Sequence, residues 1–285
     1  MSWAAHELES YVLQKHVKSG VSYLGILLGC LLPDLFTKLP VYGWTIGGFT
    51  LKADFPAQYH RSWPGVGFTH SLLFGVLFAL AVLAVTRSRC WTLGILIGEW
   101  AHVLTDTFDS VGTMLLFPFT PQHYSTGMWA YAAQAGRYGD AAAYYSSLGG
   151  VWDVLWLGVA LSGFSVLRRR YFLERVAPQD PAWAWLQRRF DLDERALVAA
   201  YRAWFVYGAS RIFGWTLWAR VLNPERGVQV VDWSWGGPGW VEAVSFPARS
   251  WAQFSLSTAW GLVGVSAALA LLWRVVGARL WARAA

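Results

Sequence analysis

Apolar stretches recur along this chain and are separated by short polar or glycine-containing segments. A helix of about 20 apolar residues crosses the ~30 Å hydrocarbon core of a bilayer, so stretches of this kind predict membrane spans. We expect an all-α fold, a polytopic membrane helical bundle of about six spans. The expected spans cover residues 21–32, 68–86, 91–111, 151–167, 199–222 and 254–273.

The segments between these stretches suggest how the chain is organised. Residues 1–20 are polar and predict an interfacial or buried amphipathic helix. Residues 171–198 are charged and interrupted by proline, which predicts a cytoplasmic helical insertion. Residues 223–253 hold a Gly/Trp-rich sequence that predicts an extramembrane outer loop with one hairpin. We therefore divide the chain into a membrane helical domain, 1–125, and additional membrane helices, 126–285.

The composition also indicates a membrane protein. Hydrophobic residues make up 55% of the chain and charged residues 14%, with a mean hydropathy of +0.34, whereas soluble domains carry about 25% charged residues. The net charge of +6 gathers in arginine clusters beside apolar stretches, which suits contact with a lipid bilayer better than binding of nucleic acid. If the clusters face the cytoplasm, the chain is a multi-pass membrane protein with both termini inside. These clusters are Arg87 with Arg89, residues 168–170, and Arg274 with Arg279.

Polar residues with metal-binding chemistry interrupt the third expected span. His102 and Asp106 are one helical turn apart, so their side chains share a helix face. A neutral imidazole beside a carboxylate suits zinc or a similar divalent ion. The alternative is a buried hydrogen bond between the two side chains that joins two helices.

Three further residues are candidate ligands of the same site. If the spans alternate, Asp34, His60 and His70 fall on the same outer side of the membrane as the His102–Asp106 pair. Five ligands from separate segments could hold two or three metal ions. Each of the three also has a simpler possible role. Asp34 could form a turn, His60 could bind lipid headgroups, and His70 could cap a helix together with the preceding threonine.

Other polar residues near this span have less defined roles. Glu99 lies one turn before His102, where it could orient the imidazole, act as a general base or bond to another helix. Asp109 continues the polar face and could support the ligands from behind. We expect His16 and His123 to be interfacial polar residues.

Short motifs in the first half of the chain follow one another in a recognisable order. They are Leu31-Leu32-Pro33-Asp34, His60-Arg61, Gly67-Phe68-Thr69-His70-Ser71-Leu72-Leu73, His102-x-x-x-Asp106, Gly112 and Phe117-Pro118. In this order they resemble the signature of the YdjM-like family of bacterial inner-membrane metal-dependent hydrolases, over roughly the first 125 residues. That family is distantly similar to zinc-dependent phospholipase C and to the zinc-dependent single-strand nucleases.

The resemblance implies a divalent metal site, with zinc as the expected metal and one to three ions bound. It adds an N-terminal histidine to the ligands found above, and this position is His6. The implied ligands are then His6, Asp34, His60, His70, His102 and Asp106. The chain departs from the family pattern in two places. Phe36 stands where the family commonly has a second acid, and residues 62–66 resemble an insertion.

Two functions fit these observations. In the first, the chain is a membrane-bound metal-dependent hydrolase of phosphoesters or lipid-like substrates. The metal lowers the pKa of a water molecule toward ~7, and Asp34 or Glu99 takes the proton. In the second, it is a catalytically silent structural or assembly subunit of a larger membrane complex. Phe36, the unmatched second half and the 20 tryptophans favour this alternative, since two interfacial belts need fewer tryptophans.

Overall fold

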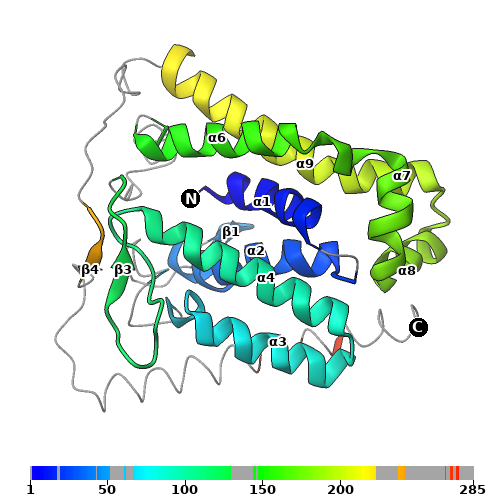
Figure 1. The fold of residues 1–285 in the computed structure, drawn as a ribbon, viewed down its shortest axis with the longest axis horizontal. Helices are drawn as coiled ribbons and strands as arrows, with labels where there is room; N and C mark the ends of the chain where they lie inside the picture. Colours follow the sequence, from blue (N-terminus) through cyan, green and yellow to red (C-terminus); the bar gives the residue numbers. More distant parts are fainter. Residues whose placement is uncertain are drawn as a thin grey trace.

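Helices dominate the computed structural model (Figure 1). The structure describes residues 2–17, 20–42, 44–51, 61, 67–129, 144–145, 147–222, 237–241, 267, 270–271 and 274–275. His60, a predicted ligand, and most of the expected span 254–273 lie outside the described residues.

The first half of the chain contains α1 (Trp3–His16), α2 (Tyr23–Tyr42), the 3-10 helix η2 (Gly67–Thr69), α3 (Leu72–Thr86), α4 (Arg89–Thr105) and the 3-10 helix η3 (Asp106–Phe108). The second half contains α6 (Leu148–Ser162), η4 (Phe164–Leu167), α7 (Arg169–Tyr171), the π-helix η5 (Phe172–Val176), η6 (Ala177–Gln179), α8 (Pro181–Phe190), α9 (Glu194–Leu217) and the π-helix η7 (Trp218–Leu222). Two antiparallel strand pairs complete the fold: β1 (Trp44–Ile46) with β2 (Phe49–Leu51), and β3 (His123–Ser125) with β4 (Gly239–Val241).

The N-terminal helix α1 lies at the centre of the molecule. It packs against α2 on one side and against α6 and α9 on the other (Figure 1). Ala4, Leu8 and Tyr11 are buried in these contacts, and the Tyr11 hydroxyl donates to the backbone carbonyl of Tyr201 in α9. Of the two expected roles for this segment, the buried helix is therefore the one that occurs.

Aromatic side chains form the largest core cluster, between α1, α2 and α9. The rings of Tyr23 and Tyr201 meet edge to face with centroids 4.8 Å apart, and Tyr11 packs 5.0 Å from Tyr23. Phe172 and Trp183 extend the cluster into the segment after α7. Because edge-to-face aromatic pairs add to simple burial, this cluster joins helices from both sides of residue 125. The division of the chain there stays a prediction.

Capping residues fix the ends of the two helices in the α3–α4 hairpin. The Ser71 hydroxyl accepts the Phe74 amide at the start of α3, and the Ser88 hydroxyl accepts the Trp91 amide at the start of α4. Between the two helices Arg87 adopts a left-handed conformation, with φ of 55°, and ends α3. So short a turn makes α3 and α4 antiparallel neighbours.

Glycines allow α2 and α4 to pack backbone against backbone. A Cβ atom on Gly98 would lie 2.2 Å from the carbonyl oxygen of Ile26, and one on Gly29 would lie 2.4 Å from that of Ile95. Only a residue without a side chain fits at such an approach. This close crossing sets the distance between the polar residues of the two helices.

The prediction of a polytopic membrane bundle is wrong. Helices occur where the apolar stretches predicted them, but no helix among the described residues combines the length and apolar character needed to cross a bilayer. The helices α3 and α6 have 15 residues each and α4 has 17, which gives about 22–26 Å against a ~30 Å hydrocarbon core. The 24-residue α9 is longer, but Arg202 and Arg211 interrupt its apolar sequence.

Two predicted connecting segments can be compared with the structure. Residues 171–198 contain the end of α7, η5, η6, α8 and the start of α9, with non-helical residues at 180 and 191–193. Their expected cytoplasmic location stays a prediction. Within 223–253 the described part is the strand β4 with the two residues before it. This strand pairs with β3 and places Val241 opposite His123, and the rest of the segment expected to hold a hairpin lies outside the described residues.

Candidate metal centre

Four of the predicted ligands meet at one buried point. Asp34, His70, His102 and Asp106 each offer one ligand atom, and these atoms all lie within 4.8 Å of one another. None of the four is more than 1% exposed. We had expected membrane spans to bring them to a common level. The close packing of α2 against α4 does so instead.

Local hydrogen bonds fix His70 beside α2. Its amide donates to the Gly67 carbonyl at 3.0 Å, which closes the 3-10 turn η2 just before α3. The hydroxyl of Thr69 donates to the Pro33 carbonyl at 3.3 Å, next to Asp34. Ser71, and not His70, caps α3. The imidazole of His70 is therefore held toward Asp34, with its Nε2 3.6 Å from the Asp34 Oδ1.

His102 has a defined orientation and tautomer. Its Nδ1 lies 2.6 Å from the carbonyl oxygen of Cys30, and because a carbonyl can only accept, Nδ1 carries a proton. In the neutral imidazole Nε2 is then an acceptor, yet it faces the Oδ2 of Asp106 at 3.2 Å and the Nε2 of His70 at 3.4 Å.

Acceptors facing one another repel, and a proton or a metal ion would remove that repulsion. Burial lowers the pKa of His70 to about 4, so this imidazole is neutral and available as a ligand at neutral pH. Two imidazoles and two carboxylates around one point form a donor set that suits a divalent ion such as zinc.

Asp106 connects this cluster to two further charged groups. The α4 helix ends one residue earlier, and the Asp106 amide bonds to the carbonyl of His102. The Arg61 guanidinium lies 2.9 Å from Asp106 Oδ2 and also binds Asp109. Burial alone would raise the pKa of Asp106, but Arg61 and the nearby histidines outweigh it and hold the pKa well below its ordinary value. Asp106 is therefore ionised. Asp109 supports it through Arg61.

His6 lies at the edge of the cluster. Its Nε2 is 3.2 Å from Asp106 Oδ1 and its Nδ1 is 3.1 Å from the Oε2 of Glu9. The ring stacks on His102 with centroids 3.8 Å apart. Burial lowers the pKa of His6 well below its ordinary value, and the nearby His102 acts in the same direction. The central position of α1 thus brings a residue from the start of the chain to the opposite carboxylate oxygen of Asp106.

Comparison with known proteins gives one match. The chain matches the family model described as YdjM inner membrane protein over residues 5–174. The chain belongs to this family. No curated protein and no solved structure matches it significantly. Membership assigns the chain to a family of inner membrane proteins.

The YdjM match includes every residue of the buried cluster together with His6 and Arg61. It also reaches past residue 125, the limit of the motifs read from the sequence, and covers α6 and α7. Part of the second half of the chain, up to residue 174, therefore also matches the family. The segment after residue 174, which includes α8 and α9, lies beyond the match.

Glu99 lies apart from the four clustered residues. Its side chain is fully buried and packs against α3, since a Cβ atom on Gly75 would lie 1.8 Å from its Oε2. Neither of its carboxylate oxygens bonds to a described residue, and burial raises its pKa well above the ordinary value. These contacts suit a neutral carboxyl between two helices. Its catalytic role stays a prediction.

The sequence did not point to two residues around this YdjM site, Arg61 and Glu9, and the expected placement of His123, a residue outside the cluster, was wrong. Arg61 was read only as part of a loop motif, although its position beside His60 was a signal. Glu9 follows His6 by three residues in a helical segment, and that spacing places the two side chains on one face. His123 is fully buried and not interfacial, with Nδ1 2.9 Å from the Val111 carbonyl. His16 is exposed.

Proposed function

We propose that this YdjM family member is a membrane-associated metal-dependent hydrolase that acts on phosphoesters, with lipid-like molecules as the preferred substrates. The observation that carries the proposal is the convergence of Asp34, His70, His102 and Asp106 on one buried point. A divalent ion held there would lower the pKa of a water molecule and polarise a phosphoryl oxygen. The family's inner membrane location supports a lipid-like substrate.

The residues in and around the cluster have different roles in this proposal. His102 is held by the Cys30 carbonyl so that Nε2 points at the centre of the cluster. Arg61 holds Asp106 in its ionised form. Asp34 is the better candidate to accept a proton, because it belongs to the cluster, whereas Glu99 packs against α3. His6 is in reach as a ligand for a second ion that shares Asp106.

A structural or assembly role in a larger membrane complex is the second candidate. Large apolar side chains on several helices are exposed and could meet partner helices. They include Leu77, Leu80, Leu155, Val206 and Phe213. In that case the buried cluster would serve the fold alone, and the purified protein would have no hydrolase activity to lose.

The test measures bound metal and phosphoesterase activity in the same preparations. His102→Ala should lower zinc affinity by more than about 100-fold, since loss of a mere partner of a metal ligand already costs 10–100-fold. Activity on bis(p-nitrophenyl) phosphate and on phospholipid vesicles should disappear with it. Asp34→Asn keeps the side-chain shape and should likewise lower zinc affinity and abolish activity. Asp106→Asn should do the same, but it also removes an ionic partner of Arg61 and will destabilise the fold.

The matched control is His123→Gln, which alters an equally buried histidine outside the four clustered residues. It should leave metal content and activity close to those of the wild type. A metal-replete wild-type protein that is inactive on these substrates, yet copurifies in fixed ratio with a membrane complex, would favour the assembly role.

A further inference from the structure

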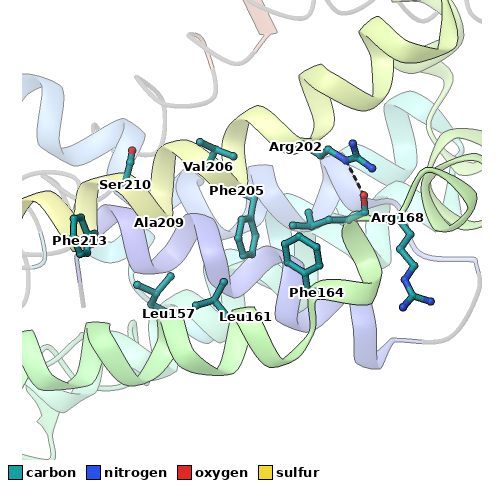
Figure 2. A pocket seen from close by; sticks show the side chains of 11 residues that line it. Leu157, Leu161, Phe164, Arg168, Arg202, Phe205, Val206, Ala209, Ser210 and Phe213 are labelled. Carbon is teal, nitrogen blue, oxygen red and sulfur yellow. Dashed lines mark hydrogen bonds between the residues drawn. The ribbon is translucent and has the colours of Figure 1, made fainter.

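An apolar groove runs between α6 and α9, on the side of these helices that does not hold the metal centre. Its volume is about 620 Å³. Figure 2 shows the side chains of the two helices facing each other across it. The apolar lining comes mainly from Leu157, Leu161, Phe164, Phe205, Val206 and Phe213. Since α1 packs between the α6–α9 pair and α2 (Figure 1), the groove is separate from the proposed catalytic site.

Several large apolar side chains that line the groove are more than half exposed. Phe164 is 59% exposed, Val206 62% and Phe213 64%. Contiguous apolar surface of this kind marks a site of interaction on a protein surface. Along α9 the lining extends from Arg202 to Phe213, and this separation of eleven residues corresponds to about 16 Å of helix. One leaflet of a bilayer has a hydrocarbon depth of about 15 Å.

Two arginines stand at one end of the groove. The Arg202 Nε donates to the Leu167 carbonyl at 2.8 Å, which ties Arg202 to the backbone next to Arg168. Figure 2 shows the Arg168 side chain leaving the same end of the groove in another direction. Within the described part of the chain, neither guanidinium has a carboxylate partner. The next two residues differ in this respect, since Arg169 pairs with Glu194 and Arg170 pairs with Glu174. The groove therefore ends in two positive charges that no described acid neutralises.

We propose that this groove binds an anionic phospholipid. One acyl chain lies along the apolar wall between α6 and α9, and the phosphate contacts Arg168 and Arg202. An apolar groove as long as one leaflet is deep, with two arginines at one end, matches both parts of such a lipid. The family's inner membrane location supplies the ligand. This inference does not depend on the hydrolase activity.

The headgroup contact is tested by native mass spectrometry of the full chain in detergent, titrated with dioleoylphosphatidylglycerol or dioleoylphosphatidylcholine. Arg168→Gln with Arg202→Gln should weaken phosphatidylglycerol binding at least tenfold, equivalent to about 1.4 kcal/mol, and affect phosphatidylcholine less. The control pair Arg169→Gln and Arg170→Gln removes the same number of positive charges next to Arg168 but spares the groove, at the loss of two exposed ion pairs. Equal losses in both pairs, or no loss in either, would overturn the proposal.

The acyl-chain contact is tested by filling the groove. Ala209 lines the apolar wall, so Ala209→Phe should reduce binding of both lipids by at least fivefold. Ala200→Phe adds the same ring to an exposed position of α9 outside the groove and is the control. Thermal unfolding of each variant shows whether the fold is kept. If a folded Ala209→Phe protein binds lipid as tightly as the wild type does, the acyl chain of the lipid does not lie in this groove.

Discussion

His102 shows how much of a site can depend on one side chain and its hydrogen bond. The Cys30 carbonyl accepts from Nδ1, so Nε2 is the ring nitrogen that faces Asp106 and His70. An unprotonated Nε2 and a carboxylate oxygen repel each other at this distance, and a proton or a metal ion between them would remove the repulsion. The same ring stacks on His6. His102, on α4, therefore contacts a candidate ligand on α1 as well as those of the buried cluster.

At the residue scale, we expect Glu9 to control metal affinity through His6. The Glu9 carboxyl group lies 3.1 Å from His6 Nδ1 and orients the ring, and burial raises the pKa of Glu9 to about 8. Glu9→Ala removes this partner in either protonation state and should weaken zinc binding about tenfold. Competition with a chromophoric chelator measures the affinity. Glu7→Ala is the control, because Glu7 is buried on the same helix but faces Gly208 of α9. An unchanged affinity in the Glu9 variant would show that Glu9 does not control metal binding through His6.

The ligand residues could be identified from sequence because their chemistry and order are distinctive. His102 and Asp106 share a helix face by spacing alone, and their mutual distance follows from it. Arg61 was missed because its role depends on contact with Asp106, 45 positions later in the chain. Glu9 was missed because it acts through His6, whose own partner Asp106 lies 100 positions later. Such contacts arise from packing, and no local pattern encodes them.

At the element scale, the crossing of α2 and α4 determines whether the site exists. Asp34 lies on α2, and His102 lies on α4 with its imidazole bonded to the α2 backbone at Cys30. The two helices come this close because glycines face one another at the crossing. The metal centre is therefore a consequence of backbone packing as much as of ligand choice.

We expect Gly98→Ala to damage both the fold and the site. The added methyl would lie 2.2 Å from the Ile26 carbonyl oxygen and 2.8 Å from the Cys30 amide, so α4 must move. Overpacking of this kind costs about 1–3 kcal/mol of unfolding free energy. Gly158→Ala is the control, since that glycine in α6 has no neighbour within 4 Å. It should be neutral or stabilise by up to about 1 kcal/mol.

Chemical denaturation measures these two free energies, and zinc affinity reports on the site. Gly98→Ala should weaken zinc binding, because the Cys30 carbonyl no longer meets His102 at the same distance. A variant that is destabilised yet binds zinc normally would show that the crossing does not set the geometry of the ligands.

Helix positions were predicted more accurately than helix lengths. Apolar runs located α2, α3, α4, α6 and α9. Their ends depend on capping groups, such as Ser71 at the start of α3, which shorten the helical part of an apolar run below the length that the run suggests. This shortening accounts for α3, α4 and α6, whereas α2 and α9, with 20 and 24 residues, carry charged side chains within their apolar sequences.

At the scale of the whole molecule, a buried acid after the family segment couples stability to pH. Asp180 accepts hydrogen bonds from the Ser22 hydroxyl and the Leu24 amide, and so holds the start of α8 against α2. Burial raises its pKa from 3.8 to about 6, more than these bonds lower it. The folded protein therefore binds this proton more tightly than the unfolded chain between about pH 4 and pH 6.

The sign of the effect follows from that difference. Where the folded state holds more protons, stability falls as pH rises. From pH 4 to pH 7 the wild type should lose up to about 3 kcal/mol relative to Asp180→Asn, two pKa units at 1.36 kcal/mol each. Thermal unfolding of both proteins across this range measures the difference. Parallel pH profiles would show that Asp180 is not the titrating group.

The central place of α1 has a consequence for how the protein is made. Tyr11 bonds to Tyr201, 190 residues later in the chain. A ribosome adds about 5–20 residues per second, so the first helix waits on the order of 10–40 s before its partner in α9 is even synthesised. During that time His6, Glu9 and the apolar face of α1 have no finished core to enter. The helix α1 can therefore pack against α2 early in synthesis but completes its packing only after α9 has been made.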